Sequence, residues 1–358
     1  MMTDQSEKIE AFLESINKTY KSDVVGRSIS SRYGVKRFST GVHALDVSLG
    51  GGWPFGRIGI VAGNESTGKT LLALKAATAI LNYDRDTRLH KDEVDPEKFS
   101  PCAALFVDVE GTFDSVWAKK HGWDEAVNVI ARPDYAEQAI DIVDFALREN
   151  TFDLIIVDSI AALTPTKEIT DSAEDWQVGL AARLVNKAMR KWSASLNKAS
   201  QESDRGGPML LCLNQVREKI GIMYGDPRVL PGGKGQLFAS SLILWTKSPK
   251  VLDDPTSKTS ALVQLGGVVK KNKTYIPNLE FMYTMALTDT EDYLVGEVDN
   301  DKSIVKVGKK FGIFNRKTGE FGCDEMRGRT EEIFRSHLRT NKDLTKLLWK
   351  RVLEEAIK

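Results

Sequence analysis

Residues 63–70 read Gly63-Asn64-Glu65-Ser66-Thr67-Gly68-Lys69-Thr70, a complete match to the phosphate-binding P-loop pattern. An apolar, β-prone stretch precedes them at 57–62, and a strong helix former follows from Leu71. A strand that turns through glycines into a helix N-terminus presents several backbone N–H groups and a positive dipole end to one anion. The stretch therefore predicts a nucleotide site in which all eight residues contact the phosphates. The alternative is an ordinary glycine turn.

Two oxygen ligands for a metal ion accompany this pattern. Lys69 can reach the β- and γ-phosphates, and the Thr70 hydroxyl can coordinate Mg²⁺. The run 155–159, Ile-Ile-Val-Asp-Ser, is an apolar strand ending in an acid, so that Asp158 would hold the same ion opposite Thr70. The motif thus predicts a nucleotide bound with Mg²⁺, with Thr70 and Asp158 as the metal ligands.

The composition is that of a globular protein, with 41% hydrophobic and 28% charged residues. The 50 basic residues balance the 50 acidic ones, so a DNA-binding surface would require local clustering. Cys102, Cys212 and Cys323 are odd in number and far apart, which favours buried, reduced thiols. No apolar run approaches the ~18 residues of a membrane span, and the polar N-terminus is unlike a signal peptide. We expect a cytoplasmic protein that does not enter a membrane.

Short apolar runs alternate with helical patterns through the middle of the chain, which predicts an α/β fold with a mostly parallel sheet. Nearly continuous apolar character suits strands that are covered on both faces. A hairpin at 261–270 and 279–285 is expected to end the sheet. Polar stretches at 82–100 and 198–207 are expected to be surface loops. The strand candidates are 57–62, 103–109, 152–157, 209–213 and 241–245.

Three regions follow from these patterns. Residues 1–36 contain a helix over 4–20 with one apolar stripe, followed by a basic linker. That stripe must be buried against either its own core or a neighbouring subunit. Residues 37–285 form the ATPase core. Residues 286–358 form a small charged α+β domain that ends in two helices, at about 330–338 and 343–357.

Two further polar side chains follow strand candidates. Glu110 lies just after 103–109, where a carboxylate in the shared crevice can orient and deprotonate an attacking water. The alternative is a helix N-cap or a solvated loop acid. Gln215 follows 209–213, where an amide could contact the γ-phosphate.

The stretch 217–235 is too long and too rich in Gly and Pro for a tight connection. Its basic residues offer phosphate contacts, and its apolar and aromatic residues offer surfaces against bases. The alternative is a flexible surface loop. A basic face on a helix after Gly179 is either a phosphate track or a solvated face. The candidate DNA contacts are Val178, Arg183, Arg190, Arg217, Lys219, Ile220, Met223, Tyr224, Gly232 and Gly233.

Several blocks in unbroken order, over roughly 38 to 285, resemble the RecA-type recombinases. They include Phe38-Ser39-Thr40-Gly41, the P-loop, Val157 to Pro165, and Asn214 to Gly221. The resemblance implies a RecA-like P-loop NTPase core with a small N-terminal helix and strand element and a small C-terminal domain. It also implies an ATP-dependent recombinase that forms filaments on single-stranded DNA and exchanges strands with homologous double-stranded DNA. A single-strand-binding protein and a loader are implied partners.

By position, the resemblance assigns roles to individual residues. Lys69 and Glu110 look catalytic, and Gln215 looks like the γ-phosphate sensor. Lys271 and Lys273 match basic residues that reach the ATP of the adjacent subunit. Asp114 and Trp117 fall where the family contacts adenine. The stretches 165–178 and 217–235 correspond to its two DNA loops.

The departures from the family pattern are the insertions at 82–100 and 198–207 and the lack of a long acidic tail. They suggest a divergent, phage-encoded member. Two other functions remain open, a hexameric DNA helicase or loader with the same core and a non-catalytic recombination mediator. Intact Lys69, Thr70, Asp158 and Glu110 argue against the mediator.

Overall fold

The computed structural model describes residues 4–20, 34–170, 179–218, 228–252 and 262–358. The chain forms two compact units, Met1–Lys36 and Arg37–Lys358. In the first unit, helix α1 (Asp4–Tyr20) occupies the segment that the apolar stripe predicted. The stripe residues Ile9, Phe12 and Tyr20 are exposed.

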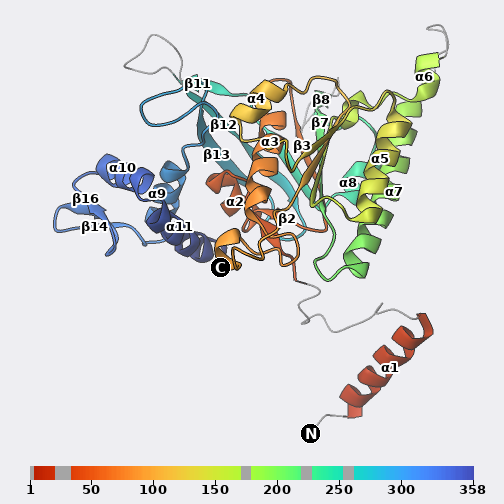
Figure 1. The fold of residues 1–358 in the computed structure, drawn as a ribbon, viewed down its shortest axis with the longest axis horizontal. Coiled ribbons are helices and arrows are strands. Elements are labelled where there is room, and N and C mark those ends of the chain that lie inside the picture. The colour runs from red at the N-terminus through yellow and green to blue at the C-terminus, as the bar shows by residue number, and fades with distance from the viewer. Residues whose placement is uncertain (1–3, 21–33, 171–178, 219–227, 253–261) are drawn as a thin grey trace. The chain divides into compact units, whose positions relative to one another are not determined.

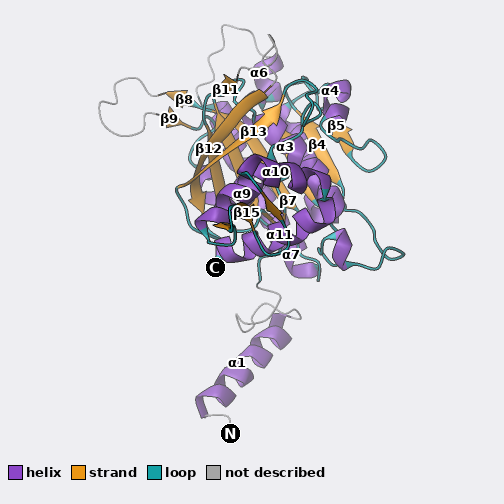
Figure 2. Ribbon diagram, turned by 90° about the vertical axis from the view of Figure 1, so that its left-hand side faces the viewer, coloured by secondary structure: helices purple, strands orange, loops and turns teal. Residues whose placement is uncertain are grey.

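The second unit is built around a nine-stranded sheet (Figure 1). The strand order is β11-β12-β10-β3-β7-β6-β4-β5, and β13 pairs with β12. Pairing is parallel from β10 to β5 and antiparallel among β10 to β13, which confirms the mostly parallel α/β fold. Figure 2 shows the long antiparallel pair β12 and β13. The strands are β3 (Ile58–Gly63), β4 (Ala104–Asp108), β5 (Val129–Ala131), β6 (Leu154–Asp158), β7 (Met209–Gln215), β10 (Leu242–Thr246), β11 (Lys250–Leu252), β12 (Leu262–Asn272) and β13 (Leu279–Ala286).

Helices cover both faces of this sheet. On one face, α2 (His43–Leu49) and α3 (Lys69–Ala79) share a core with alternate strand residues such as Val61. On the other face, α5 (Ala136–Glu149) and α7 (Leu180–Glu202) pack against residues such as Ile60. Side chains on both faces of each strand are therefore buried, which explains the nearly continuous apolar runs of the sequence.

Shorter elements complete the core region. The two-stranded pair β1 (Arg37–Phe38) and β2 (Trp53–Pro54) lies next to α2 in the sequence. A second two-stranded pair is formed by β8 and β9 at the ends of residues 217–229. The remaining α-helices and strands are α4 (Ser115–Lys120), α6 (Thr166–Thr170), β8 (Arg217–Glu218), β9 (Arg228–Val229) and α8 (Gly235–Ala239).

The structure corrects three expectations. Edge strands β5 and β11 were not predicted, because each has three residues and Val129 and Val251 are exposed. The expected DNA loop 165–178 begins with helix α6. The expected loop at 198–207 is helical to Glu202, since Leu196 and Ala199 extend the buried stripe of α7.

The C-terminal part has its own small core around Phe334, whose ring contacts those of Phe314 and Phe321. It is joined to the core by stacking of the Trp349 and His43 rings, 3.9 Å apart. Its elements are α9 (Asn300–Lys310), β14 (Asn315–Lys317), β15 (Glu320–Gly322), β16 (Arg327–Gly328), α10 (Glu331–Thr340) and α11 (Lys342–Ile357).

The first insertion also contacts this C-terminal part. Asp92 accepts an ion pair from Lys346 at 3.3 Å, and Glu93 accepts one from Lys350 at 2.7 Å. Both pairs are exposed to solvent, so each contributes at most about 1 kcal/mol.

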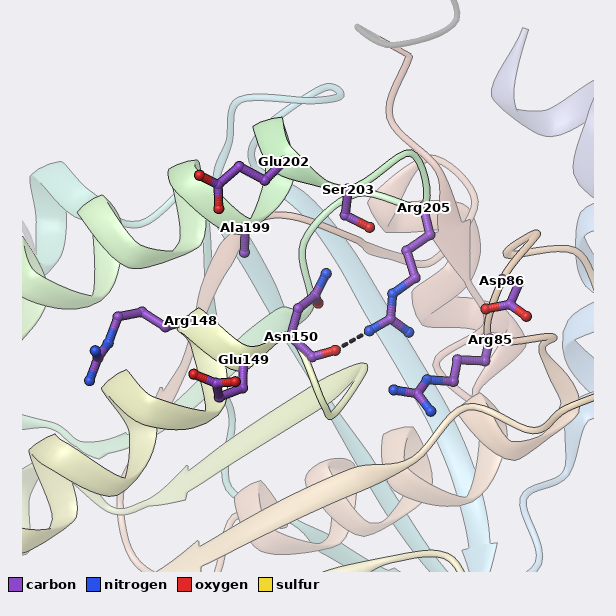
Figure 3. Close-up of a pocket in the computed structure, with 9 residues that line it drawn as sticks. All are labelled: Arg85, Asp86, Arg148, Glu149, Asn150, Ala199, Glu202, Ser203 and Arg205. Atoms are coloured by element: carbon purple, nitrogen blue, oxygen red, sulfur yellow. Dashed lines mark hydrogen bonds between the residues drawn. The ribbon is translucent and has the colours of Figure 1, made fainter. Parts of the chain in front are cut away.

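The two insertions meet at the end of the sheet where β6 begins. Arg88 from the first donates to Asp153 at 2.5 Å, and Arg205 from the second pairs with the same carboxylate oxygen at 3.0 Å. Arg205 also donates to the carbonyl oxygen of Asn150 (Figure 3). A cavity of about 390 Å³ lies beside this cluster and is lined by Arg85, Asp86, Arg148, Glu149, Asn150, Ala199, Glu202, Ser203 and Arg205.

Replacing Asp153 with asparagine should lower the free energy of unfolding by about 3 kcal/mol, because the side chains of Asp153 and Arg88 are fully buried and one partner would keep an unpaired charge. Equilibrium denaturation in urea measures the change. The control Asp92→Asn removes an exposed pair and should cost less than about 1 kcal/mol. Equal losses in the two variants would contradict the distinction.

Candidate nucleotide and DNA site

The P-loop connects β3 to α3 through residues with left-handed backbone. Ser66 has φ 57° and Gly68 has φ 83°. A Cβ atom on Gly63 would lie 1.8 Å from Thr246 Oγ1, so only glycine fits there. Thr246 is also 2.7 Å from Thr67 Oγ1, which ties the loop to β10. The N-terminus of α3 thus follows a loop that the neighbouring strand holds in place, as anion binding requires.

The two predicted metal ligands lie together. Thr70 Oγ1 donates to Asp158 Oδ2 at 2.8 Å, although 88 residues separate them in the sequence. Lys69 Nζ donates to the Asn64 carbonyl oxygen at 2.7 Å, so its ammonium group lies over its own loop. A hydroxyl, a carboxylate and an ammonium group converge beside the helix N-terminus.

Burial is the main cause that raises the pKa of Asp158 to about 6; the neighbouring carboxylates of Glu110 and Asp108 act in the same direction, while the Thr70 hydrogen bond and the Lys69 charge oppose the shift. Burial lowers the pKa of Lys69, and the carboxylates of Asp158, Glu110 and Glu65 oppose that shift. The carboxylates of the site therefore outnumber its ammonium group, and a bound divalent cation would compensate for the excess negative charge.

Glu110 lies in the same crevice. Its Oε1 accepts a hydrogen bond from Ser159 Oγ at 2.5 Å, and its backbone N–H donates to the Asp158 carbonyl oxygen at 3.1 Å. Glu110 does not cap a helix: the N-cap of α4 is Asp114. Of the two alternatives left open for Glu110, the helix cap is wrong.

Asp108 is a site residue that the sequence reasoning missed. Its buried carboxylate accepts from the backbone N–H groups of Thr112 and Phe113 at 3.1 and 3.0 Å, and from Arg132 Nε at 3.2 Å. These bonds fix the turn that carries Glu110. The available signal was an acid at the end of an apolar strand, the same signal that identified Asp158.

The residues predicted to contact adenine begin α4. Asp114 accepts from the backbone N–H groups of Val116 and Trp117 at 2.8 and 3.0 Å, so one of its oxygens is used as a helix cap. Trp117 is 41% exposed, which leaves indole surface accessible.

The end of β7 joins the P-loop to the second predicted DNA loop. Gln215 is paired in register with Gly63, at the carboxyl end of both strands. Asn214 is fully buried, and its Nδ2 donates to the Pro231 carbonyl oxygen at 3.2 Å and to Gln236 Oε1 at 2.7 Å. A movement of Gln215 would therefore act on its neighbour Asn214, whose side chain is bonded directly to the base of residues 217–235.

The described DNA candidates lie on α7 and at the base of that loop. Arg183 and Arg190 are exposed on α7, and Arg217 is exposed on β8. Gly232 and Gly233 approach Val185 and Asn186 of α7 closely. Val178, Lys219, Ile220, Met223 and Tyr224 lie outside the described residues.

Lys271 and Lys273 lie far from the P-loop of their own chain. Lys271 is in register with Ile243 of β10, which is in register with Ile60 of β3. The Lys273 N–H donates to the Ser241 carbonyl oxygen, level with the start of β3. The P-loop follows the other end of β3, roughly 10 Å beyond Ile60 along the strand direction. In addition, β3 lies two strands away from β12, which carries Lys271. The structure does not bring these lysines to the site with Lys69.

The arrangement fits a nucleotide triphosphate with Mg²⁺. Oxygen ligands from Thr70 and Asp158 suit Mg²⁺, and the P-loop, the helix N-terminus and Lys69 suit phosphates. Fold and site together define a P-loop NTPase with its site at the carboxyl ends of parallel strands.

Comparison with known proteins identifies the family within this class. The RecA N-terminal domain family matches residues 7–287. Protein RecA of Mycobacteroides abscessus is 33% identical over 357 residues, covering 98% of this chain and 93% of the relative. The RecA proteins of Amycolatopsis mediterranei and of a Nocardioides species are each 32% identical, covering 98% of this chain and 92% of the relative. The chain belongs to the RecA family.

Its activity follows from that membership. The protein is a DNA-dependent ATPase that uses ATP with Mg²⁺ and acts as a recombinase in DNA recombination and repair. It binds single-stranded and double-stranded DNA and forms filaments. Among the described helices, none is long and apolar enough to cross a membrane.

Proposed function

We propose that each ATP is hydrolysed at a site completed by two subunits. One subunit contributes the P-loop, Glu110 as the base for the attacking water, and Gln215 as the γ-phosphate sensor. The adjacent subunit contributes Lys271 and Lys273. Thr70 and Asp158 would hold Mg²⁺, which would supply positive charge to neutralise the phosphates. Asp114 and Trp117 contact the adenine.

The position of the lysines in the sheet is the observation that supports a shared site. Lys271 is level with Ile60 in the middle of β3 and Lys273 is level with the start of β3, whereas the P-loop follows the end of that strand. A lysine side chain cannot bridge that separation within one chain. Next to Lys271, Phe238 is 74% exposed and Leu237 is 40% exposed, which is the apolar surface expected of an interface.

Replacing both Lys271 and Lys273 with alanine should lower ATP turnover on single-stranded DNA by roughly 10²-fold, because two cations that stabilise the transferring phosphate would be lost. Binding of ATP to the isolated subunit should be unchanged. Phosphate release and equilibrium nucleotide binding measure the two quantities. The control replaces the exposed lysines Lys91 and Lys98, which removes the same charge elsewhere.

Mixing separates a shared site from a structural defect. The double variant keeps its P-loop, and the Lys69→Ala variant keeps Lys271 and Lys273. In an equimolar mixture about a quarter of the head-to-tail contacts would combine the intact halves, so activity should exceed that of either variant alone. A mixture no more active than its components would overturn the shared site.

A DNA path is proposed along α7 and the two loops 165–178 and 217–235. Exposed Arg183, Arg190 and Arg217 support phosphate contacts, and Gly232 and Gly233 support a close turn at the loop base. The fixed link from Asn214 to Pro231 supports communication between the ATP site and this path.

The remaining proposals concern organisation and surroundings. The domain limits are proposed at 1–36, 37–285 and 286–358, and a single-strand-binding protein and a loader are proposed partners. A cytoplasmic location is proposed because Cys102, Cys212 and Cys323 are all free and buried.

A further inference from the structure

His121 is a buried imidazole behind the predicted adenine site. It is the C-cap residue of α4, directly after the helix that carries Trp117, and it is fully buried. Neither of its ring nitrogens has a hydrogen-bond partner in the described part of the chain. Burying two unpaired polar atoms costs free energy, so hydrogen bonding does not explain the choice of this side chain.

The contacts of the ring are with Trp117 and with a glycine. The imidazole and indole rings are 4.4 Å apart, with their planes at 69°, the edge-to-face arrangement that aromatic pairs favour. On another side, a Cβ atom at Gly296 would lie 2.5 Å from His121 Nδ1, and Gly296 has φ 82°. The backbone of Gly296 therefore lies directly against the imidazole ring.

The backbone of His121 is anchored to the helix that follows the P-loop. Its carbonyl oxygen accepts from Thr78 Oγ1 at 2.9 Å and from Lys75 Nζ at 3.4 Å, both on α3. Burial, with a smaller contribution from the Lys75 charge, lowers the pKa of His121 to about 4. The ring is neutral at physiological pH, so it can contact the indole without a buried charge.

We propose that His121 is a positioning residue for nucleotide binding, holding the Trp117 indole in the orientation that stacks on the base. This inference rests on the proposed role of Trp117. The phosphate-binding loop and the base-binding indole are then fixed to each other through α3 and His121. Trp117 is 41% exposed, which leaves the surface that a base requires.

The test compares two substitutions at His121 with two ligands. His121→Leu keeps an apolar side chain of similar size without the aromatic contact, and His121→Phe keeps an aromatic ring. Each purified full-length variant is titrated with ATP and with ribose 5-triphosphate, which has the phosphates but no base. Thermal unfolding checks the fold, and KM and kcat for ATP are measured on single-stranded DNA.

His121→Leu should weaken ATP binding by about three- to ten-fold and raise KM similarly, with little change in kcat or in ribose triphosphate binding. His121→Phe should bind ATP within about two-fold of the unchanged protein. Equal weakening for both ligands would assign His121 a merely structural role and overturn the inference. So would ATP binding that neither substitution alters.

A third variant separates this inference from the proposed function. Trp117→Ala should weaken ATP binding at least as much as His121→Leu, and ribose triphosphate binding should be unchanged. If Trp117→Ala binds ATP normally, the base contact fails and the inference fails with it. If Trp117→Ala weakens ATP binding and His121→Leu does not, only the inference fails.

Discussion

Replacing Lys69 with alanine should lower ATP hydrolysis on single-stranded DNA by roughly 10²- to 10³-fold, the loss typical of removing one preorganised electrostatic contact. Lys69 places its ammonium group beside the carboxylates of Asp158 and Glu110. Without it, the triphosphate would face both carboxylates with less compensating charge, so ATP binding should weaken as well. Phosphate release at several ATP concentrations measures both effects.

The control is Lys342→Ala, an exposed lysine at the start of α11 that removes the same charge from a different region. It should leave hydrolysis unchanged. A Lys69→Ala protein that keeps more than about a tenth of the hydrolysis rate would mean that this P-loop does not serve the ATPase reaction.

Replacing Glu110 with glutamine should lower hydrolysis by roughly 10²- to 10⁴-fold, the contribution typical of a general base. Unlike Lys69→Ala, it should leave ATP binding intact, because the amide oxygen can still accept the Ser159 hydrogen bond. Filaments formed with ATP should therefore persist, since the nucleotide is bound and not consumed. Single-turnover hydrolysis and electron microscopy of the filaments measure the two outcomes.

The matched control is Glu125→Gln, an exposed acid that pairs with Lys119 at 2.9 Å. It should hydrolyse ATP normally. If Glu110→Gln instead hydrolyses ATP normally, Glu110 is the solvated loop acid that the sequence left as an alternative.

Local sequence signals were sufficient for the central part of the fold. The runs that became β3, β4, β6, β7 and β10 are apolar because both faces of each strand are buried. The P-loop residues and Asp158 follow directly from strand ends, so their convergence was predictable. Edge strands β5 and β11 were missed because three half-exposed residues leave no clear period.

Contacts between distant segments that no motif or strand end marks could not be predicted. Arg88 and Asp153 are 65 residues apart, and neither has a local pattern that names its partner. Asn214 directly precedes Gln215, but its side chain donates to Pro231 and Gln236 at the base of the following loop, and no local pattern indicates these partners. The partner of Glu110, Ser159, follows from the way β4 and β6 pair in register, which the sequence does not state.

Lys271 and Lys273 lie toward the end of the sheet opposite the P-loop, so an assembly whose contacts join these lysines to a neighbouring P-loop has a direction. A contact that joins these two ends is head-to-tail, and such contacts propagate into rings or helices in place of closing as a two-fold dimer. An open chain of subunits then has two different ends. If the proposed site is shared in this way, one end would carry a P-loop without its lysines, the other would carry lysines without a P-loop, and an isolated subunit would hold no complete site. Growth and loss of subunits at the two ends can therefore respond differently to ATP.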